Sequence, residues 1–330
     1  MDRKKIYDII YSLAAKDGRE AALFGDCAPA AREAFSRCLT GDTFPELWFE
    51  VPLAGKPWFD FHALVSYEDV AGTQAVFAGH GGVYGNALAW FAAQKPKKVR
   101  QLALSYDTSC DDTEHPAVQV LVSGRDAATP VGFLRAAGRS DAEAPYLKFV
   151  RAIPQDWFAC YVGVFPRRTV EGADSWIRVE CIVGDALQEA YAHDSGILRN
   201  HLASIGIEHI GSDAIAGIQE LARSPFPLEL QFNIGPNGTA LPVVSASVRF
   251  QPGDWMDPAG QDAISKIASW MQAQGLADAR CILLAKTTFA QLATYKDESA
   301  SLSCFPAFVK LRYREGQAPD AKAYLLARAE

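Results

Sequence analysis

The chain has 330 residues, of which 49 % are hydrophobic and 22 % are charged, a composition typical of one large or two ordinary globular domains. Its net charge of −7 gives no overall attraction to nucleic acid or to an anionic membrane, so any anion must be bound by locally placed Arg and Lys side chains. No apolar run approaches the roughly 18–20 residues that span a bilayer, and the amphipathic start Ile6–Ala15 is unlike a signal peptide.

Two short segments of alternating polarity come as a pair five times along the chain, and this alternation predicts paired β-strands. The first pair is Leu47–Pro52 with Trp58–Tyr67, across a turn that contains Gly55 and Pro57. The later pairs are Gln101–Asp107 with Ala117–Ser123, Trp157–Phe165 with Trp176–Ile182, Leu228–Ile234 with Leu241–Phe250, and Leu302–Phe305 with Ala307–Tyr313.

Helical patterns separate the strand pairs. Asp257-Pro258, for example, is typical of a helix N-cap followed by a proline in the first turn. No linker or composition shift divides the chain, which predicts a single domain over residues 1–330. The predicted helices are Lys4–Lys16, Ala30–Leu39, Asn86–Gln94, Ala142–Ile153, Ser195–Ile205, Asp213–Arg223, Pro258–Gln274, Thr287–Tyr295 and Asp320–Ala329.

Successive residues of a strand point to opposite faces, so the predicted strands present one apolar face and one unusually polar face. An open antiparallel sheet covered by helices on one side would leave the polar face in water, whereas a closed barrel would enclose it as a lumen. Ten strands with enough helices to cover them favour the barrel, because closure removes exposed sheet edges. Tryptophans also fall on the polar face, which suits a ligand chamber: Trp48, Trp58 and Trp176.

This order of five helix–strand–strand–helix repeats resembles the ABBA aromatic prenyltransferases across the whole chain. The resemblance depends on architecture and on no short sequence motif. It implies an α+β fold: a ten-stranded antiparallel PT barrel with helices outside and the active site in the lumen. It also implies transfer of a prenyl group from an allylic isoprenoid diphosphate to an aromatic or peptide side-chain acceptor.

The leaving diphosphate in such a reaction needs fixed positive charges and hydrogen-bond donors. Four basic residues on the polar face are the candidates: Arg178, Arg249, Lys310 and Arg312. The alternative is that they are solvated strand residues, or partners of Glu180 and Glu229 on the same face.

The allylic cation needs aromatic faces and exclusion of water, and the acceptor needs a base. Glu50 is the preferred base, since it resembles the acidic residue on an early strand of many ABBA enzymes; Asp60 and His62 are the nearest alternatives and could orient it. The candidate substrate-binding residues are Trp48, Trp58, Trp176, Tyr161, Gln119 and Gln231.

Neither a metal nor an organic cofactor is expected to be required. Asp111-Asp112-Thr113-Glu114 lacks a second aspartate at the spacing that the magnesium-binding motifs of terpene synthases need, so magnesium is treated as optional. Seven scattered cysteines without Cys-x-x-Cys predict buried thiols and a cytoplasmic location. A non-catalytic protein that binds a small hydrophobic ligand or a peptide in the same lumen is the alternative function.

Overall fold

The computed structural model describes residues 46–68, 70–79, 82–107, 115–123, 126–165, 177–281, 289–295 and 298–329, together with positions 29 and 33. The predicted helices Lys4–Lys16 and Ala30–Leu39 lie outside the described residues, apart from position 33. The acidic segment 111–114 and Trp176 also lie outside them.

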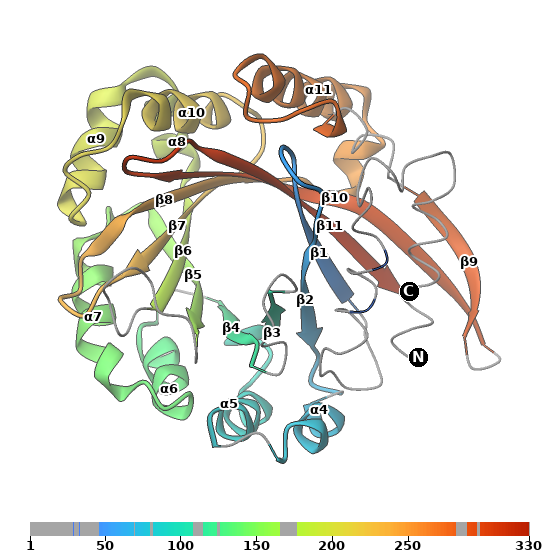
Figure 1. Ribbon diagram of the computed structural model, residues 1–330. Helices are drawn as coiled ribbons and strands as arrows, with labels where there is room; N and C mark the ends of the chain where they lie inside the picture. The colour runs from blue at the N-terminus through green and yellow to red at the C-terminus, as the bar shows by residue number, and fades with distance from the viewer. Residues whose placement is uncertain are drawn as a thin grey trace.

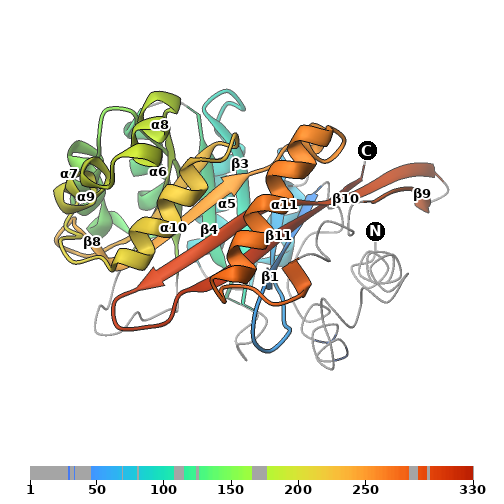
Figure 2. The same ribbon diagram turned by 90° about the horizontal axis from the view of Figure 1, so that it is seen from above.

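One antiparallel sheet of eleven strands organises the chain. Strand β11 pairs with β1 on one side and with β10 on the other, so ten of the strands form a closed ring, and β9 extends the sheet beyond that ring by pairing with β10. Figure 1 shows the barrel nearly end-on and Figure 2 shows it from above. The strands are β1 (Glu46–Pro52), β2 (Asp60–Val65), β3 (Val99–Tyr106), β4 (Ala117–Val122), β5 (Trp157–Val164), β6 (Ile177–Val183), β7 (Leu228–Ile234), β8 (Ala240–Arg249), β9 (Phe289–Tyr295), β10 (Glu298–Arg314) and β11 (Asp320–Ala329).

Helices cover the outside of the barrel (Figure 1). They are α4 (Val70–Val76), α5 (Gly82–Ala92), α6 (Ala128–Ala136), α7 (Glu143–Ala152), α8 (Asp185–His193), α9 (Ser195–Ser204), α10 (Ser212–Ala222) and α11 (Pro258–Ala273), with short 3-10 turns at Ser140–Ala142 and Pro252–Trp255. Within the part of the chain that the structure describes, none of these helices has the length and apolar character to cross a membrane.

The hydrophobic core fills the space between the barrel wall and these helices. Phe232 of β7, fully buried, stacks on Trp157 with ring centroids 5.4 Å apart and meets Phe149 of α7 at 5.8 Å. Removing a fully buried phenylalanine such as these costs about 3–5 kcal/mol. The apolar strand faces therefore turn outward to the helices, and the polar faces line the lumen, which confirms the predicted barrel and the first four predicted strand pairs.

The fifth predicted pair is wrong. The segments on either side of Pro306 form one strand, β10, which pairs with β8, β9 and β11 and not with itself. Proline lacks the N–H that a strand ladder needs, which is why a break was expected there. The structure keeps the strand continuous through a register shift between Pro306 and Phe308, a local bulge against β11.

Two predicted helices are also strands. Asp320–Ala329 is β11, and most of Thr287–Tyr295 is β9. Alanine and leucine favour helix, but β11 pairs on both sides, and this pairing outweighs the intrinsic preference. The helices α4, α6 and α8 had not been predicted from the sequence.

Candidate active site

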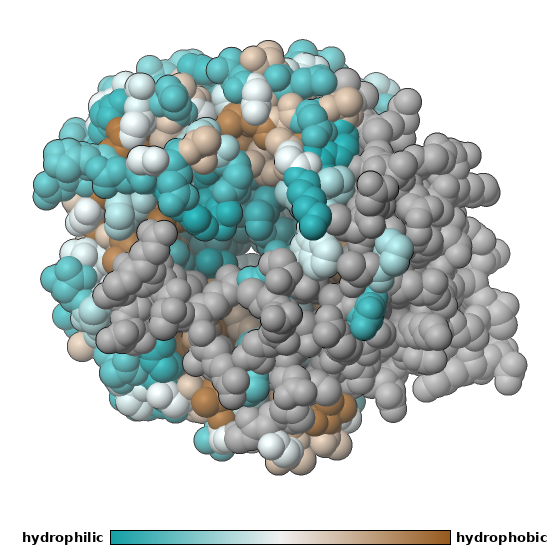
Figure 3. Space-filling view, in the orientation of Figure 1, coloured by the Kyte–Doolittle hydropathy of each residue, from teal (hydrophilic) through white to brown (hydrophobic). Residues whose placement is uncertain are grey.

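The barrel lumen contains a cavity to which every strand of the closed ring contributes at least one side chain. Figure 3 shows hydrophilic residues bordering a narrow opening on the end of the molecule that faces the viewer in Figure 1. The lining residues are Trp48, Glu50, His62, Leu64, Ala103, Gln119, Tyr161, Arg178, Glu180, Gln231, Ser247, Phe308, Lys310 and Tyr324.

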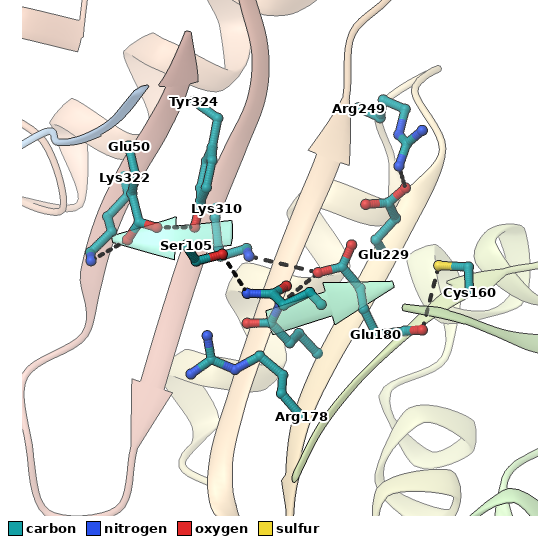
Figure 4. A network of polar contacts seen from close by, with 12 residues as sticks. Glu50, Ser105, Cys160, Arg178, Glu180, Glu229, Arg249, Lys310, Lys322 and Tyr324 are labelled. Carbon is teal, nitrogen blue, oxygen red and sulfur yellow. Dashed lines mark hydrogen bonds and ion pairs between the residues drawn. The ribbon is translucent and has the colours of Figure 1, made fainter. Parts of the chain in front are cut away.

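Glu50 of β1 is surrounded by polar groups from two neighbouring strands. Lys322 of β11 contacts its Oε1 atom, and the Tyr324 hydroxyl, also on β11, donates a hydrogen bond to Oε2 at 2.7 Å. His62 of β2 places Nε2 3.4 Å from the same Oε2 atom. The carboxylate is thus fixed on both of its oxygens (Figure 4).

These contacts decide the charge of Glu50. Burial by itself raises the pKa of this carboxyl, but Lys322, His62 and Lys310 together lower the pKa well below its usual range. In return, Glu50 raises the pKa of Lys322, while burial and Glu50 raise the pKa of the Tyr324 hydroxyl. Glu50 is consequently an ionised acceptor at neutral pH, next to a protonated lysine and a neutral phenol.

A short chain of hydrogen bonds orients His62. Its Nδ1 atom lies 2.6 Å from Oγ of Ser105 on β3, and the side-chain amide of Gln119 on β4 donates to the same Oγ at 2.9 Å. The His62 ring also stacks on Tyr324 with centroids 5.7 Å apart. Four strands therefore cooperate to hold the groups around Glu50.

Lys310 of β10 lies between two carboxylates. Its ammonium group is 3.7 Å from Oε2 of Glu180 on β6 and 4.8 Å from the ring centroid of Tyr324. Burial lowers the pKa of Lys310, whereas Glu180 and Glu50 both act to raise it. The Glu180 carboxylate balances the charge of Lys310 within the lumen, and Gln231 of β7 donates a hydrogen bond to that carboxylate at 2.6 Å.

Arg178 of β6 is the other cation that lines the cavity. Its Nε donates to Oδ1 of Asn233 at 3.2 Å, and its guanidinium lies 4.6 Å from the ring centroid of Phe165. Figure 4 shows the end of its guanidinium pointing away from Glu180. A guanidinium is planar, permanently charged and shaped to bind an anion through two parallel hydrogen bonds.

Aromatic rings form one wall of the cavity. Trp48 of β1 and Phe308 of β10 have centroids 5.0 Å apart, and Phe308 meets Tyr324 edge-on at 6.0 Å. The Trp48 indole donates to Glu46 at 2.6 Å, which fixes the ring. Such faces can stabilise a cation that forms beside them, and they exclude water from it.

The cavity includes most of the predicted site residues: Glu50, His62, Arg178, Lys310, Trp48, Tyr161, Gln119 and Gln231. Three others lie nearby without lining it. Asp60 stands opposite Glu50 and close enough to influence Lys322, Arg249 forms an ion pair with Glu229, and Arg312 forms an ion pair with Asp320 at 2.6 Å.

Trp58 does not reach the cavity. It precedes β2 in the connection from β1, where the chain no longer alternates as a strand, and Lys56 lies 5.9 Å from its ring centroid. The structure therefore places this predicted substrate-binding residue elsewhere.

Three residues of the site had not been predicted: Lys322, Tyr324 and Phe308. The first two were missed because β11 resembles a helix in composition, whereas Phe308 lies in the predicted strand Ala307–Tyr313, on the same face as Lys310, and was not singled out as a site residue. The signal for β11 is present as alternation, since Ala321, Ala323, Leu325 and Ala327 are buried outward while Lys322 and Tyr324 point into the lumen.

Within the described ranges, no three His, Cys, Asp or Glu side chains are grouped so that they could hold a metal ion. The cavity lining combines the carboxylates Glu50 and Glu180 with the cations Arg178 and Lys310.

No family model matches the chain, and no curated protein matches it in sequence. Similarity is found among solved structures. The apo form of the prenyltransferase PriB is 13 % identical with a TM-score of 0.53, covering 98 % of this chain and 94 % of that chain. The 6-dimethylallyltryptophan synthase of Micromonospora olivasterospora, in complex with DMASPP and Trp, is 13 % identical with a TM-score of 0.51, covering 98 % and 95 %.

A ternary complex of PriB with L-tryptophan and dimethylallyl thiolodiphosphate is 14 % identical with a TM-score of 0.50, covering 96 % of this chain and 93 % of that chain. At this level of identity, the similarity establishes the PT-barrel fold across the chain.

Proposed function

We propose that this chain is an aromatic prenyltransferase that moves a prenyl group from an allylic diphosphate to an aromatic acceptor inside the barrel. The observation that carries the proposal is the grouping of an ionised carboxylate, two cations and three aromatic rings around one enclosed cavity: Glu50, Arg178, Lys310, Trp48, Phe308 and Tyr324. The PT-barrel prenyltransferase structures described above, in complex with DMASPP and Trp or with L-tryptophan and dimethylallyl thiolodiphosphate, support the same chemistry.

The first step would break the bond between C1 of the prenyl group and the diphosphate oxygen, which leaves with the electron pair. Arg178 and Lys310, which line the cavity, would stabilise the charge on that leaving group. Trp48, Phe308 and Tyr324 would face the resulting allylic cation and keep water away from it.

The second step would form a bond between the cation and a carbon of the acceptor ring, and the proton on that carbon would pass to Glu50. An arenium ion is a strong acid, so an ionised carboxylate with a lowered pKa is still basic enough to accept this proton. Tyr324 and Lys322 hold the carboxylate in place for the transfer.

We further propose that the diphosphate is held by these cations without an obligatory metal ion. Magnesium carried in by the diphosphate remains compatible with the site. A tenfold molar excess of EDTA is expected to leave a substantial part of the transfer rate.

The test is to incubate the purified protein with dimethylallyl or geranyl diphosphate and a panel of acceptors. Tryptophan, tyrosine, hydroxybenzoate and a tryptophan-containing peptide cover the expected classes. A mass gain of one prenyl unit that is lost in Glu50→Gln and kept in Glu189→Gln, a control on the exposed side of α8, would support the proposal.

Diphosphate binding without turnover of any acceptor would favour a binding protein. If neither dimethylallyl diphosphate nor geranyl diphosphate binds to the protein, both the proposed enzyme activity and the use of this lumen for diphosphates are contradicted.

A further inference from the structure

Glu229 is a buried carboxylate beside the cavity that the proposed chemistry leaves unused. It lies on β7, opposite Ile182 of β6 and Ser247 of β8, and only 1 % of its surface is exposed. Its Oε1 atom is 2.8 Å from a terminal nitrogen of Arg249 on β8 (Figure 4). A carboxylate buried this deeply stays ionised only where nearby positive charges or hydrogen-bond donors stabilise its charge.

The neighbouring strands supply charges of both signs. The charge of Glu180 on β6 acts on Glu229, and Arg249 and Lys310 add positive charge from β8 and β10. Cys160 and Tyr161 face the same group from β5. The carboxyls of Glu180 and Glu229 therefore form an acidic pair between two cations.

Two buried carboxylates whose charges act on each other do not both ionise readily, so ionisation of one favours a proton on the other. Burial by itself raises the pKa of Glu180. The Lys310 ammonium, the hydrogen bond that Gln231 donates to Glu180 and the other neighbours of Glu180 outweigh burial, so the pKa of Glu180 is lowered. Burial and the charge of Glu180 raise the pKa of Glu229 to about 8, even though Arg249 acts in the opposite direction. At neutral pH the shared proton resides on Glu229.

This proton sets the charge that a ligand meets. With Glu229 protonated, Arg249 and Lys310 face one carboxylate and the group carries one net positive charge. With Glu229 ionised, the two cations face two carboxylates and the net charge is zero. Arg249 also lies 4.8 Å above the ring of Phe308, which lines the cavity, so a modest movement would bring its guanidinium to an anion there.

We propose that Glu229 is a positioning residue for the donor: the proton it shares with Glu180 releases Arg249 from its ion pair, so that Arg249 binds the diphosphate. This inference rests on the proposed function, because it assumes that a diphosphate occupies the lumen. No bond is made or broken; the proton stays on the carboxyl pair and the guanidinium changes partner. Donor binding and proton binding then strengthen each other.

The experiment compares the affinity of the wild type and Glu229→Gln for inorganic pyrophosphate between pH 7 and pH 9 by isothermal titration calorimetry. Glutamine imitates the protonated carboxyl and cannot ionise. Because pyrophosphate itself titrates in this range, the ratio of the two dissociation constants is used, and the ionisation of the ligand cancels. We expect a ratio near one at pH 7 that rises to about tenfold at pH 9, with the wild type binding more weakly.

Proton uptake gives a second reading. At pH 8.5, titrations in two buffers with different ionisation enthalpies are expected to show the wild type taking up more protons on binding than Glu229→Gln. Parallel pH profiles and equal proton uptake in the two proteins would overturn the role of Glu229 while leaving diphosphate binding intact. Absence of pyrophosphate binding by both proteins at every pH would overturn the proposed function as well.

If Glu229→Gln does not fold, carbon-13 NMR of the wild-type carboxyls decides the matter. The Glu229 carboxyl is expected to titrate near pH 8 alone and at higher pH with saturating pyrophosphate. Titration at the ordinary pH of a glutamate, or a midpoint unchanged by pyrophosphate, would contradict the inference.

Discussion

The ammonium group of Lys322 contacts Oε1 of Glu50, although 272 positions separate these two residues in the chain. The contact exists because the last strand closes the barrel onto the first, with Glu50 opposite Tyr324 in the register between β1 and β11. Closure of the fold and assembly of the candidate base are thus the same event.

Replacing Lys322 with methionine tests this dependence. Burial then acts on Glu50 with its main opposing charge removed, so the pKa of Glu50 should rise. The acidic limb of the pH–rate profile is expected to move to higher pH, with activity at pH 6 reduced about tenfold or more. Lys266→Met, which removes an exposed lysine paired with Asp262 on α11, should leave the profile unchanged. If the acidic limb of the pH–rate profile stays in the same place in Lys322→Met, ionisation of Glu50 does not determine that limb.

Tyr324→Phe removes one hydroxyl and keeps the ring that packs against Lys310, His62 and Phe308. The lost hydrogen bond ends on an ionised carboxylate, and bonds of that kind contribute roughly 1.5–3 kcal/mol. We expect kcat to fall about tenfold or more, with little change in pyrophosphate affinity. A change confined to pyrophosphate affinity would instead assign the hydroxyl to the donor.

The alternation of apolar and polar residues predicts most of this fold. In β1, Leu47, Phe49 and Val51 are buried outward while Trp48 and Glu50 line the lumen, as the pattern indicates. A period of two specifies both the strand and its buried face, and a strand slipped by one residue would bury charges. The position of Glu50 on the lumen face was therefore identifiable from the alternation, whereas its candidate role as the base came from the resemblance to the ABBA enzymes.

The C-terminal part was harder, for a physical reason. The segment that forms β11 is rich in alanine and leucine, and its local preference for helix is overcome by partners on β1 and β10 far away in sequence. Because this segment was predicted as a helix, Lys322 and Tyr324 were not assigned to the lumen. The ion pair of Arg249 with Glu229 agrees with the alternative that basic residues of the polar face are partners of its glutamates, whereas the pairing of Arg312 with Asp320 depends on the position of β11.

The four predicted diphosphate-binding cations should differ in importance. Arg178 lines the cavity, whereas Arg312 is paired with Asp320 and does not line it. Arg178→Ala is expected to weaken pyrophosphate binding by roughly 10–100-fold, and Arg312→Ala by less than about threefold. Calorimetry at two salt concentrations measures both variants. Equal losses would mean that the diphosphate lies closer to the Arg312 end of the lumen.

Trp48 offers a test of water exclusion. Its ring forms a wall of the cavity with Phe308, so truncation to alanine should admit water to the allylic cation. We expect the ratio of prenyl alcohol to prenylated acceptor to rise several-fold in Trp48→Ala and much less in Trp48→Phe. Product analysis by mass spectrometry gives the ratio directly. An unchanged ratio alongside a slower reaction would limit Trp48 to packing.

The shared proton of the acidic pair should also appear in the stability of the folded protein. The pKa of Glu229 is raised from about 4.5 to about 8 by burial and by Glu180, so folding favours its protonated form. Its contribution to stability is complete below the unfolded-state pKa and is lost as the pH rises towards 8.

Glu229→Gln has no carboxyl proton to lose. The difference in free energy of unfolding, variant minus wild type, should therefore increase by on the order of a few kcal/mol between pH 5 and pH 8 and stay constant above pH 8. Urea unfolding at one-unit intervals of pH measures the difference. Glu50→Gln provides the opposite sign, because the lowered pKa of Glu50 gives stability that is present above about pH 4.5 and lost in acid. Its difference from the wild type should be flat from pH 6 to pH 8. Parallel stability curves for the wild type and Glu229→Gln would mean that Glu229 is ionised in the folded protein and that Arg249 outweighs both burial and Glu180.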